Sequence, residues 1–201
     1  MNMETWRAWQ RVETWLAENA PGSHRSLRPP ASDLDIAHAH EYVPLHEDLR
    51  TLLALHDGTE SYEIDGDEEG EVNPAAWLPE SSEWLPLDRM LALPAVALAG
   101  SGRPDRAPWA APGDGHYGFA VEAASGHVTR FPDEGLAPLE PTPAYVTSLA
   151  AYLTAFAEAL ESGTGPLIDP RSRPGIALGC LLWEDPERVS LDEAPWHPLH
   201  P

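Results

Sequence analysis

The N-terminal third of the chain has apolar residues at helical spacing in three segments. In the first, Trp6, Trp9, Val12 and Leu16 lie three or four positions apart. This spacing predicts a helix that ends near Pro21, with its stripe facing the core rather than a partner. A second helix is predicted from Ser32, because Ser32 and Asp35 form an S-x-x-D start, and Pro44 closes it.

A third helix is predicted directly after the second. It has an inward leucine face and stops at His56-Asp57-Gly58, where Gly58 suits a left-handed end. Short extended segments then follow, one around Ile64 and two that begin at Trp77 and Trp84. A further helix is predicted from Asp88 to about Pro94.

The second half shows a hairpin and a closing helix. Apolar residues alternate over 117–121, Gly126 turns the chain, and residues 128–131 return it, which predicts a hairpin. The closing helix is predicted to be capped by Thr142, to have Pro143 at its first position and to end at Gly163. Its inward face consists of Tyr145, Leu149, Tyr152, Leu153, Phe156 and Leu160.

Helices, then short strands, then a closing helix predict an α+β fold, with a mixed or antiparallel sheet of short strands backed by helices. We expect this domain to cover residues 1–163. Residues 164–201 form a Pro-rich C-terminal extension. Since its apolar run over 176–183 would not remain exposed, we expect the extension to dock on the domain.

Charge narrows the classes of function. The chain has 33 Asp+Glu and 12 Lys+Arg residues, which gives a formal net charge of −21. All twelve of these basic residues are arginine, and the sequence contains no lysine. The absence of lysine excludes a GxxxxGK[ST] phosphate loop and a Schiff-base nucleophile. The negative balance argues against nucleic acid and against an anionic membrane as partners. Neither a signal peptide nor an apolar run long enough to span a bilayer is visible, so the sequence predicts a cytoplasmic protein.

No residue set in the sequence indicates a catalytic or metal site. The chain has no GxSxG elbow and no HExxH motif. The single cysteine, Cys180, lies in an apolar run and is predicted to be packed and inert. We therefore predict no enzymatic activity, cofactor or metal, and the alternative that stays open is an acidic hydrolase that uses two carboxylates.

The acids are concentrated in one segment. Eight of the fifteen residues from Asp57 to Glu71 are acidic and none is basic. A calcium loop starting at Asp65 would have Asp67 at position three and Gly70 at position six, but its position twelve is Ala76, which has no carboxylate. A hydrated acidic loop or a partner-binding patch is the preferred interpretation.

Candidate partner contacts follow from this segment and from the tryptophans. An indole near a strand end or in a loop either anchors an interface or fills the core. The candidate partner-binding residues are Asp57, Asp65, Asp67, Glu68, Glu69, Trp77 and Trp109.

Several short motifs together resemble the SUKH superfamily. They are Leu27–Ser32, the Leu-Leu-Ala-Leu-His-Asp-Gly run over 52–58, Trp84–Leu87, Gly113-Asp114-Gly115 followed by 117–121, Gly126–Val128, and Ser148–Leu153 with Leu160–Gly163. The resemblance covers residues 1–163. It implies an α+β domain with a sheet backed by helices, no catalytic residues, and one surface that binds a partner.

The family's namesake is a fungal cell-wall-assembly regulator, and most of its bacterial members are immunity proteins of toxin systems. The resemblance therefore implies an immunity protein that occludes a cognate toxin. An acidic inhibitor suits a basic, nuclease-type toxin, because a nuclease must bind phosphate. The alternative is a regulatory or scaffold protein related to cell-wall assembly.

Overall fold

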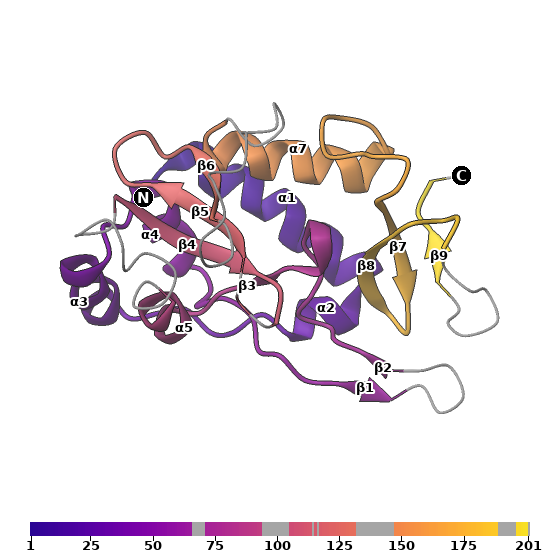
Figure 1. The fold of residues 1–201 in the computed structure, drawn as a ribbon, viewed down its shortest axis with the longest axis horizontal. Coiled ribbons are helices and arrows are strands. Elements are labelled where there is room, and N and C mark those ends of the chain that lie inside the picture. The colour runs from indigo at the N-terminus through magenta and orange to yellow at the C-terminus, as the bar shows by residue number, and fades with distance from the viewer. Residues whose placement is uncertain are drawn as a thin grey trace.

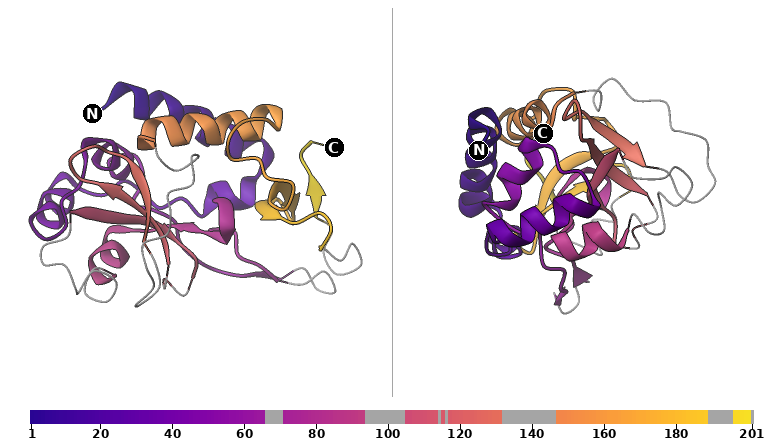
Figure 2. Two further views of the ribbon diagram at one scale, coloured as in Figure 1. Left: turned by 45° about the horizontal axis from the view of Figure 1, so that its top comes forward. Right: turned by 90° about the vertical axis from the view of Figure 1, so that its left-hand side faces the viewer.

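Two long helices lie side by side over one face of a small antiparallel sheet. In the computed structural model, which describes residues 1–65, 71–93, 105–113, 115, 117–131, 147–188 and 196–200, these helices are α1 (Met3–Asn19) and α7 (Leu149–Ser162). Figure 1 and Figure 2 show the helix pair on one side and the strands on the other. The described residues thus form a mixed α+β structure, as the pattern predicted, and they contain small antiparallel sheets and six helices.

The main sheet has four antiparallel strands in the order β3-β4-β5-β6. These are β3 (Glu83–Trp84), β4 (Arg106–Ala111), β5 (Gly118–Glu122) and β6 (Val128–Phe131). The predicted hairpin of β5 and β6 is confirmed. The hydrophobic pattern does not indicate strand β4, which contains Pro108. The register shifts between Pro108 and Ala110, and such an irregularity lets a strand contain a proline.

Four shorter helices complete the helical part: α2 (Pro21–Arg25), α3 (Asp33–Tyr42), α4 (Glu47–Leu53) and α5 (Leu87–Ala92), with a 3-10 turn at Pro79–Ser81. The predicted start of α3 is confirmed, since the Ser32 hydroxyl accepts a hydrogen bond from the Asp35 N–H at 3.1 Å. The helix also ends before Pro44, as expected.

Two predicted helix ends are wrong. Helix α4 ends at Leu53, so His56-Asp57-Gly58 lies beyond it in irregular chain. Helix α7 begins at Leu149, because the Ser148 hydroxyl caps it by accepting from the Ala151 N–H at 3.2 Å. The expected cap Thr142, with Pro143 and Tyr145, lies outside the described residues.

Large aromatic side chains fill the space between the helix pair and the sheet. The biggest fully buried residues include Trp9, Trp77, Trp84 and Trp109. Trp9 meets Trp84 edge-on at 5.0 Å between ring centroids, and Trp109 meets Tyr152 of α7 at 5.5 Å. Such edge-on pairs stabilise a core beyond the area they bury. The stripe of α1 therefore faces the core, as predicted.

The C-terminal extension shares this core. It forms a three-stranded sheet in the order β8-β7-β9, from β7 (Arg173–Ala177), β8 (Cys180–Glu184) and β9 (His197–Pro198). Leu181 and Trp183 belong to the main hydrophobic cluster. The Leu181 N–H also donates to the Ser23 hydroxyl at 3.0 Å, which joins the extension to α2.

The backbone at Gly58 passes very close to the segment that leads into α5. Gly58 has a φ of 71°, in the left-handed region, and a Cβ there would lie 2.5 Å from the Pro86 nitrogen and 2.6 Å from the Leu85 carbonyl carbon. Both the conformation and the space require glycine. The residue predicted as a helix stop is therefore a site of close backbone approach.

We expect Gly58→Ala to lower the free energy of unfolding by about 2 kcal/mol or more, through left-handed strain and overpacking against backbone. The matched control is Gly113→Ala, where the nearest atom to a new Cβ is 3.7 Å away. The control is expected to change stability by less than about 1 kcal/mol. Urea unfolding followed by tryptophan fluorescence measures both, and equal losses would contradict this explanation.

Candidate protein-binding surfaces

Part of the acidic segment forms an arm that projects from the body of the molecule. Strands β1 (Ile64–Asp65) and β2 (Glu71–Val72) pair antiparallel, with Ile64 opposite Val72 and Asp65 opposite Glu71. We call residues 60–65 and 71–72 the acidic arm. Figure 1 and Figure 2 show it extending beyond the sheets. The predicted contacts Asp67, Glu68 and Glu69 lie outside the described residues.

Four carboxylates of the arm are exposed to solvent. They belong to Glu60, Glu63, Asp65 and Glu71. The antiparallel register places Asp65 directly across from Glu71, and like charges in cross-strand positions repel each other. The described part of the arm thus presents a concentrated negative surface.

The apolar side of the arm packs on the C-terminal sheet. Val72 forms a second buried cluster with Ala177, Cys180 and Trp196, and Ile64 packs against it. Burial raises the pKa of the Cys180 thiol, which therefore stays protonated at neutral pH. Cys180 is a packing residue beneath the arm, in agreement with its predicted inert role.

A buried carboxylate fixes both strands of the arm at their root. Glu83 of β3 is 3% exposed. Its Oε1 accepts from the Ser61 hydroxyl at 3.1 Å and from the Asn73 amide at 2.8 Å, and its Oε2 accepts from Arg89 at 2.7 Å. Arg89 in turn donates to the Gly113 carbonyl at 3.1 Å. A charge can be buried here because it is paired and fully hydrogen-bonded.

Trp77, which follows β2, anchors the arm in the main core. It is 1% exposed and contacts Trp9 and Phe156, with ring centroids 6.2 and 5.8 Å away. Its carbonyl accepts a hydrogen bond from the Trp183 indole at 3.0 Å. Trp109 on β4 is also 1% exposed. The predicted interface role of Trp77 and Trp109 does not fit this burial, because neither indole reaches the surface.

Asp57 also makes contacts within the fold. Its Oδ1 accepts from the Leu87 N–H at 2.9 Å, at the first residue of α5, and its Oδ2 lies 3.6 Å from an Arg28 nitrogen. An N-terminal N–H of a helix has no partner within the helix, and a carboxylate from elsewhere in the chain satisfies it. Of the predicted site residues that are described, only Asp65 lies on the exposed arm.

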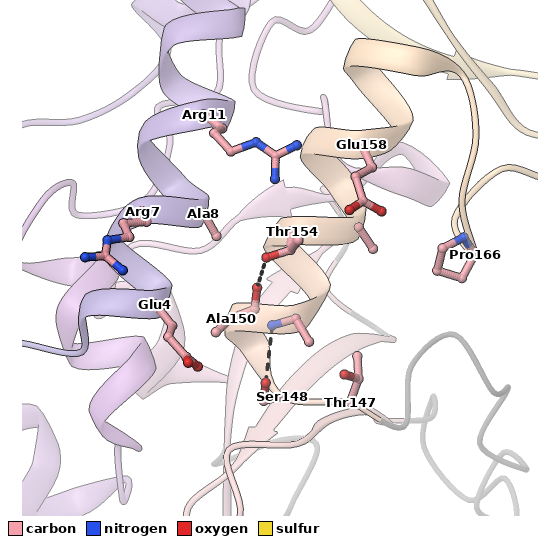
Figure 3. A pocket seen from close by; sticks show the side chains of 12 residues that line it. Glu4, Arg7, Ala8, Arg11, Thr147, Ser148, Ala150, Thr154, Glu158 and Pro166 are labelled. Atoms are coloured by element: carbon pink, nitrogen blue, oxygen red, sulfur yellow. Dashed lines mark hydrogen bonds between the residues drawn. The ribbon is translucent and has the colours of Figure 1, made fainter.

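A groove runs between α1 and α7, with a volume of about 760 Å³. In Figure 3 the Arg11 side chain extends from α1 across the groove toward α7. Arg11 holds Glu161 through two hydrogen bonds of 3.1 and 2.6 Å, and this pairing raises the pKa of the Arg11 guanidinium. The pair links the two helices at the surface, where such an ion pair contributes about 0–1 kcal/mol.

The described residues contain no cluster of three or more His, Cys, Asp or Glu side chains placed to hold a metal ion. Five of the twelve positions of the hypothetical calcium loop, residues 66–70, fall outside them. None of the described helices has the length and apolar character needed to cross a bilayer.

No protein-family model matches the chain, and no curated protein matches it.

Sequence reasoning missed the residues that position the arm. Glu83 and Arg89 are 6 positions apart, whereas Ser61 lies within the acidic segment and Asn73 follows its last residue, Glu71, by two positions. A weak signal was present, because Glu83 is an acid directly before the apolar residues Trp84 and Leu85. An acid in such a setting is exposed or paired, and the sequence does not name its partner.

We expect Glu83→Gln to lower the free energy of unfolding by about 1–3 kcal/mol, because it weakens charge-assisted hydrogen bonds and leaves Arg89 without its counter-charge. The control is Asp105→Asn, which removes an ion pair with Arg106 at a side chain that is 79% exposed. The control is expected to change stability by less than about 0.5 kcal/mol. Chemical denaturation measures both variants, and a neutral result for Glu83→Gln would contradict the proposed network.

Proposed function

We propose that this chain is a non-enzymatic protein-binding module whose acidic arm binds a basic protein surface. The observation that carries the proposal is the position of the exposed carboxylates of Glu60, Glu63, Asp65 and Glu71 on a projecting arm. The net charge of the chain, −21, has the same sign as the charge of the arm. The electrostatic field of the whole molecule therefore adds to the attraction of the arm for a cationic partner.

The root of the arm supports this proposal. A surface that is already ordered before association loses less conformational entropy on binding than a flexible acidic loop does. Ser61 and Asn73 hold the two ends of the arm on Glu83, and Ile64 and Val72 hold its middle on the C-terminal sheet. A guanidinium or ammonium group placed between Asp65 and Glu71 would offset the repulsion between these carboxylates.

The specific partner that we propose is a basic, nuclease-type toxin, which makes the chain an immunity protein. The resemblance of residues 1–163 to the SUKH superfamily supports this assignment. A nuclease surface rich in Lys and Arg complements a carboxylate-bearing arm, and an arm bound over that surface blocks the approach of phosphate.

The test begins with a search for a toxin gene beside the gene of this chain, and a basic nuclease domain encoded there is the binding partner used. An arm variant carries Glu60→Gln, Glu63→Gln and Glu71→Gln, and a control variant carries Glu18→Gln, Glu158→Gln and Glu187→Gln, which are also exposed glutamates. We expect the arm variant to associate about tenfold more slowly than the unmodified chain at low salt, and the control to associate within about twofold of it.

Stopped-flow mixing over a series of salt concentrations measures these rates, and inhibition of nuclease activity provides the second readout. Equal association rates for the two variants would show that the arm is not part of the interface. A neighbourhood without a toxin gene would contradict the immunity assignment and favour the regulatory or scaffold role instead.

A further inference from the structure

A second groove lies at the end of the molecule opposite to the acidic arm. It runs between α3 and α4, with a volume of about 700 Å³. Ile36, Ala37 and Ala54 form its apolar part. The N-terminal residues lie beside it, because the Asn2 side chain donates to Asp48 of α4 at 2.6 Å. Figure 1 shows α3 and the acidic arm on opposite sides of the molecule.

Two strongly exposed apolar side chains adjoin this groove. Met1, which lines it, is 79% exposed. Leu34 of α3 is also 79% exposed, and it shares a helix face with Ala37 and Glu41, which line the groove, because these residues follow it by three and seven positions. Single exposed apolar residues are ordinary, but exposed apolar residues at the edge of a groove are typical of an interaction surface.

The charged residues of the groove indicate what kind of partner fits. Asp33 and Glu41 of α3 and Glu47 of α4 are exposed along it, against one arginine, Arg50. A second copy of this chain would bring the same acidic groove and would itself carry a net charge of −21. Electrostatic repulsion therefore disfavours self-association at this face. A cationic partner is favoured instead.

We propose that the groove between α3 and α4 binds an amphipathic helix of another protein, with an apolar stripe in the groove and Lys or Arg on its flanks. Helix-in-groove binding uses apolar anchors at positions i, i+3, i+4 and i+7, and charges at the rim set orientation and choice of partner. This inference does not depend on the acidic arm, which lies at the other end of the molecule.

The probe is a synthetic peptide of about 18 residues, long enough to form a helix, with Leu at i, i+3, i+4 and i+7 and Lys at the flanking positions. Two comparison peptides are used. The first has the same composition in scrambled order, and the second has Glu in place of every Lys. Each peptide is titrated into the isotope-labelled full chain, and backbone amide chemical shifts locate and quantify binding.

Matched variants identify the groove. Ala37→Arg adds bulk and positive charge inside it at an exposed helix position, and Ala151→Arg makes the same change on the exposed face of α7. Arginine is a good helix former, so both variants are expected to fold. A second groove variant, Leu34→Gln, removes one exposed apolar contact without adding charge.

We expect saturable binding of the Lys peptide, with shifts in α3 and α4 and weaker binding of both comparison peptides. Ala37→Arg should weaken this binding by more than about tenfold and Leu34→Gln by about threefold, whereas Ala151→Arg should leave it unchanged. Shifts centred on the acidic arm, equal affinity for the scrambled peptide, or unchanged affinity in both groove variants would each overturn the proposal. Concentration-dependent shifts in α3 without peptide would instead indicate a second copy and would also overturn it.

Discussion

The indole of Trp77 packs against Trp9 of α1 and Phe156 of α7, and three parts of the chain depend on this contact. The body depends on it because these rings fill the space between the helix pair and the sheet. The C-terminal extension depends on it because Trp183 donates to the Trp77 carbonyl. The acidic arm depends on it because β2 leads directly into this anchored segment. One aromatic core thus stabilises both the fold and its most charged projection.

The negative charge of the arm opposes its folding into an ordered hairpin. Carboxylates on a two-stranded arm repel one another, and a short hairpin alone is marginally stable in water. The structure offsets this cost with buried contacts at the root. Glu83 receives hydrogen bonds from Ser61 and Asn73, and Val72 is buried with Trp196. The extension therefore acts as a support for the surface that we propose to bind a partner.

Much of the fold was accessible from periodicity and local caps, and much of the site was not. Helix α3 and the β5–β6 hairpin follow from local signals, such as the Ser32 cap and the alternation around Phe119. Burial does not follow from local sequence. Trp77 resembles an exposed anchor because prolines and short extended pieces surround it, but tertiary packing places it in the core. Asp57 and Asp65 come from one acidic run, yet Asp57 caps a helix 30 residues away.

The most direct test of this account is amide hydrogen exchange in a Trp196→Ala variant of the full chain. Trp196 is 3% exposed and belongs to the cluster beneath the arm. The account predicts much faster exchange in peptides covering residues 60–65 and 71–75, with unchanged protection in β5, β6 and α7, because local supports open independently of the main core. Unchanged exchange in the arm, or equally faster exchange throughout the chain, would contradict it.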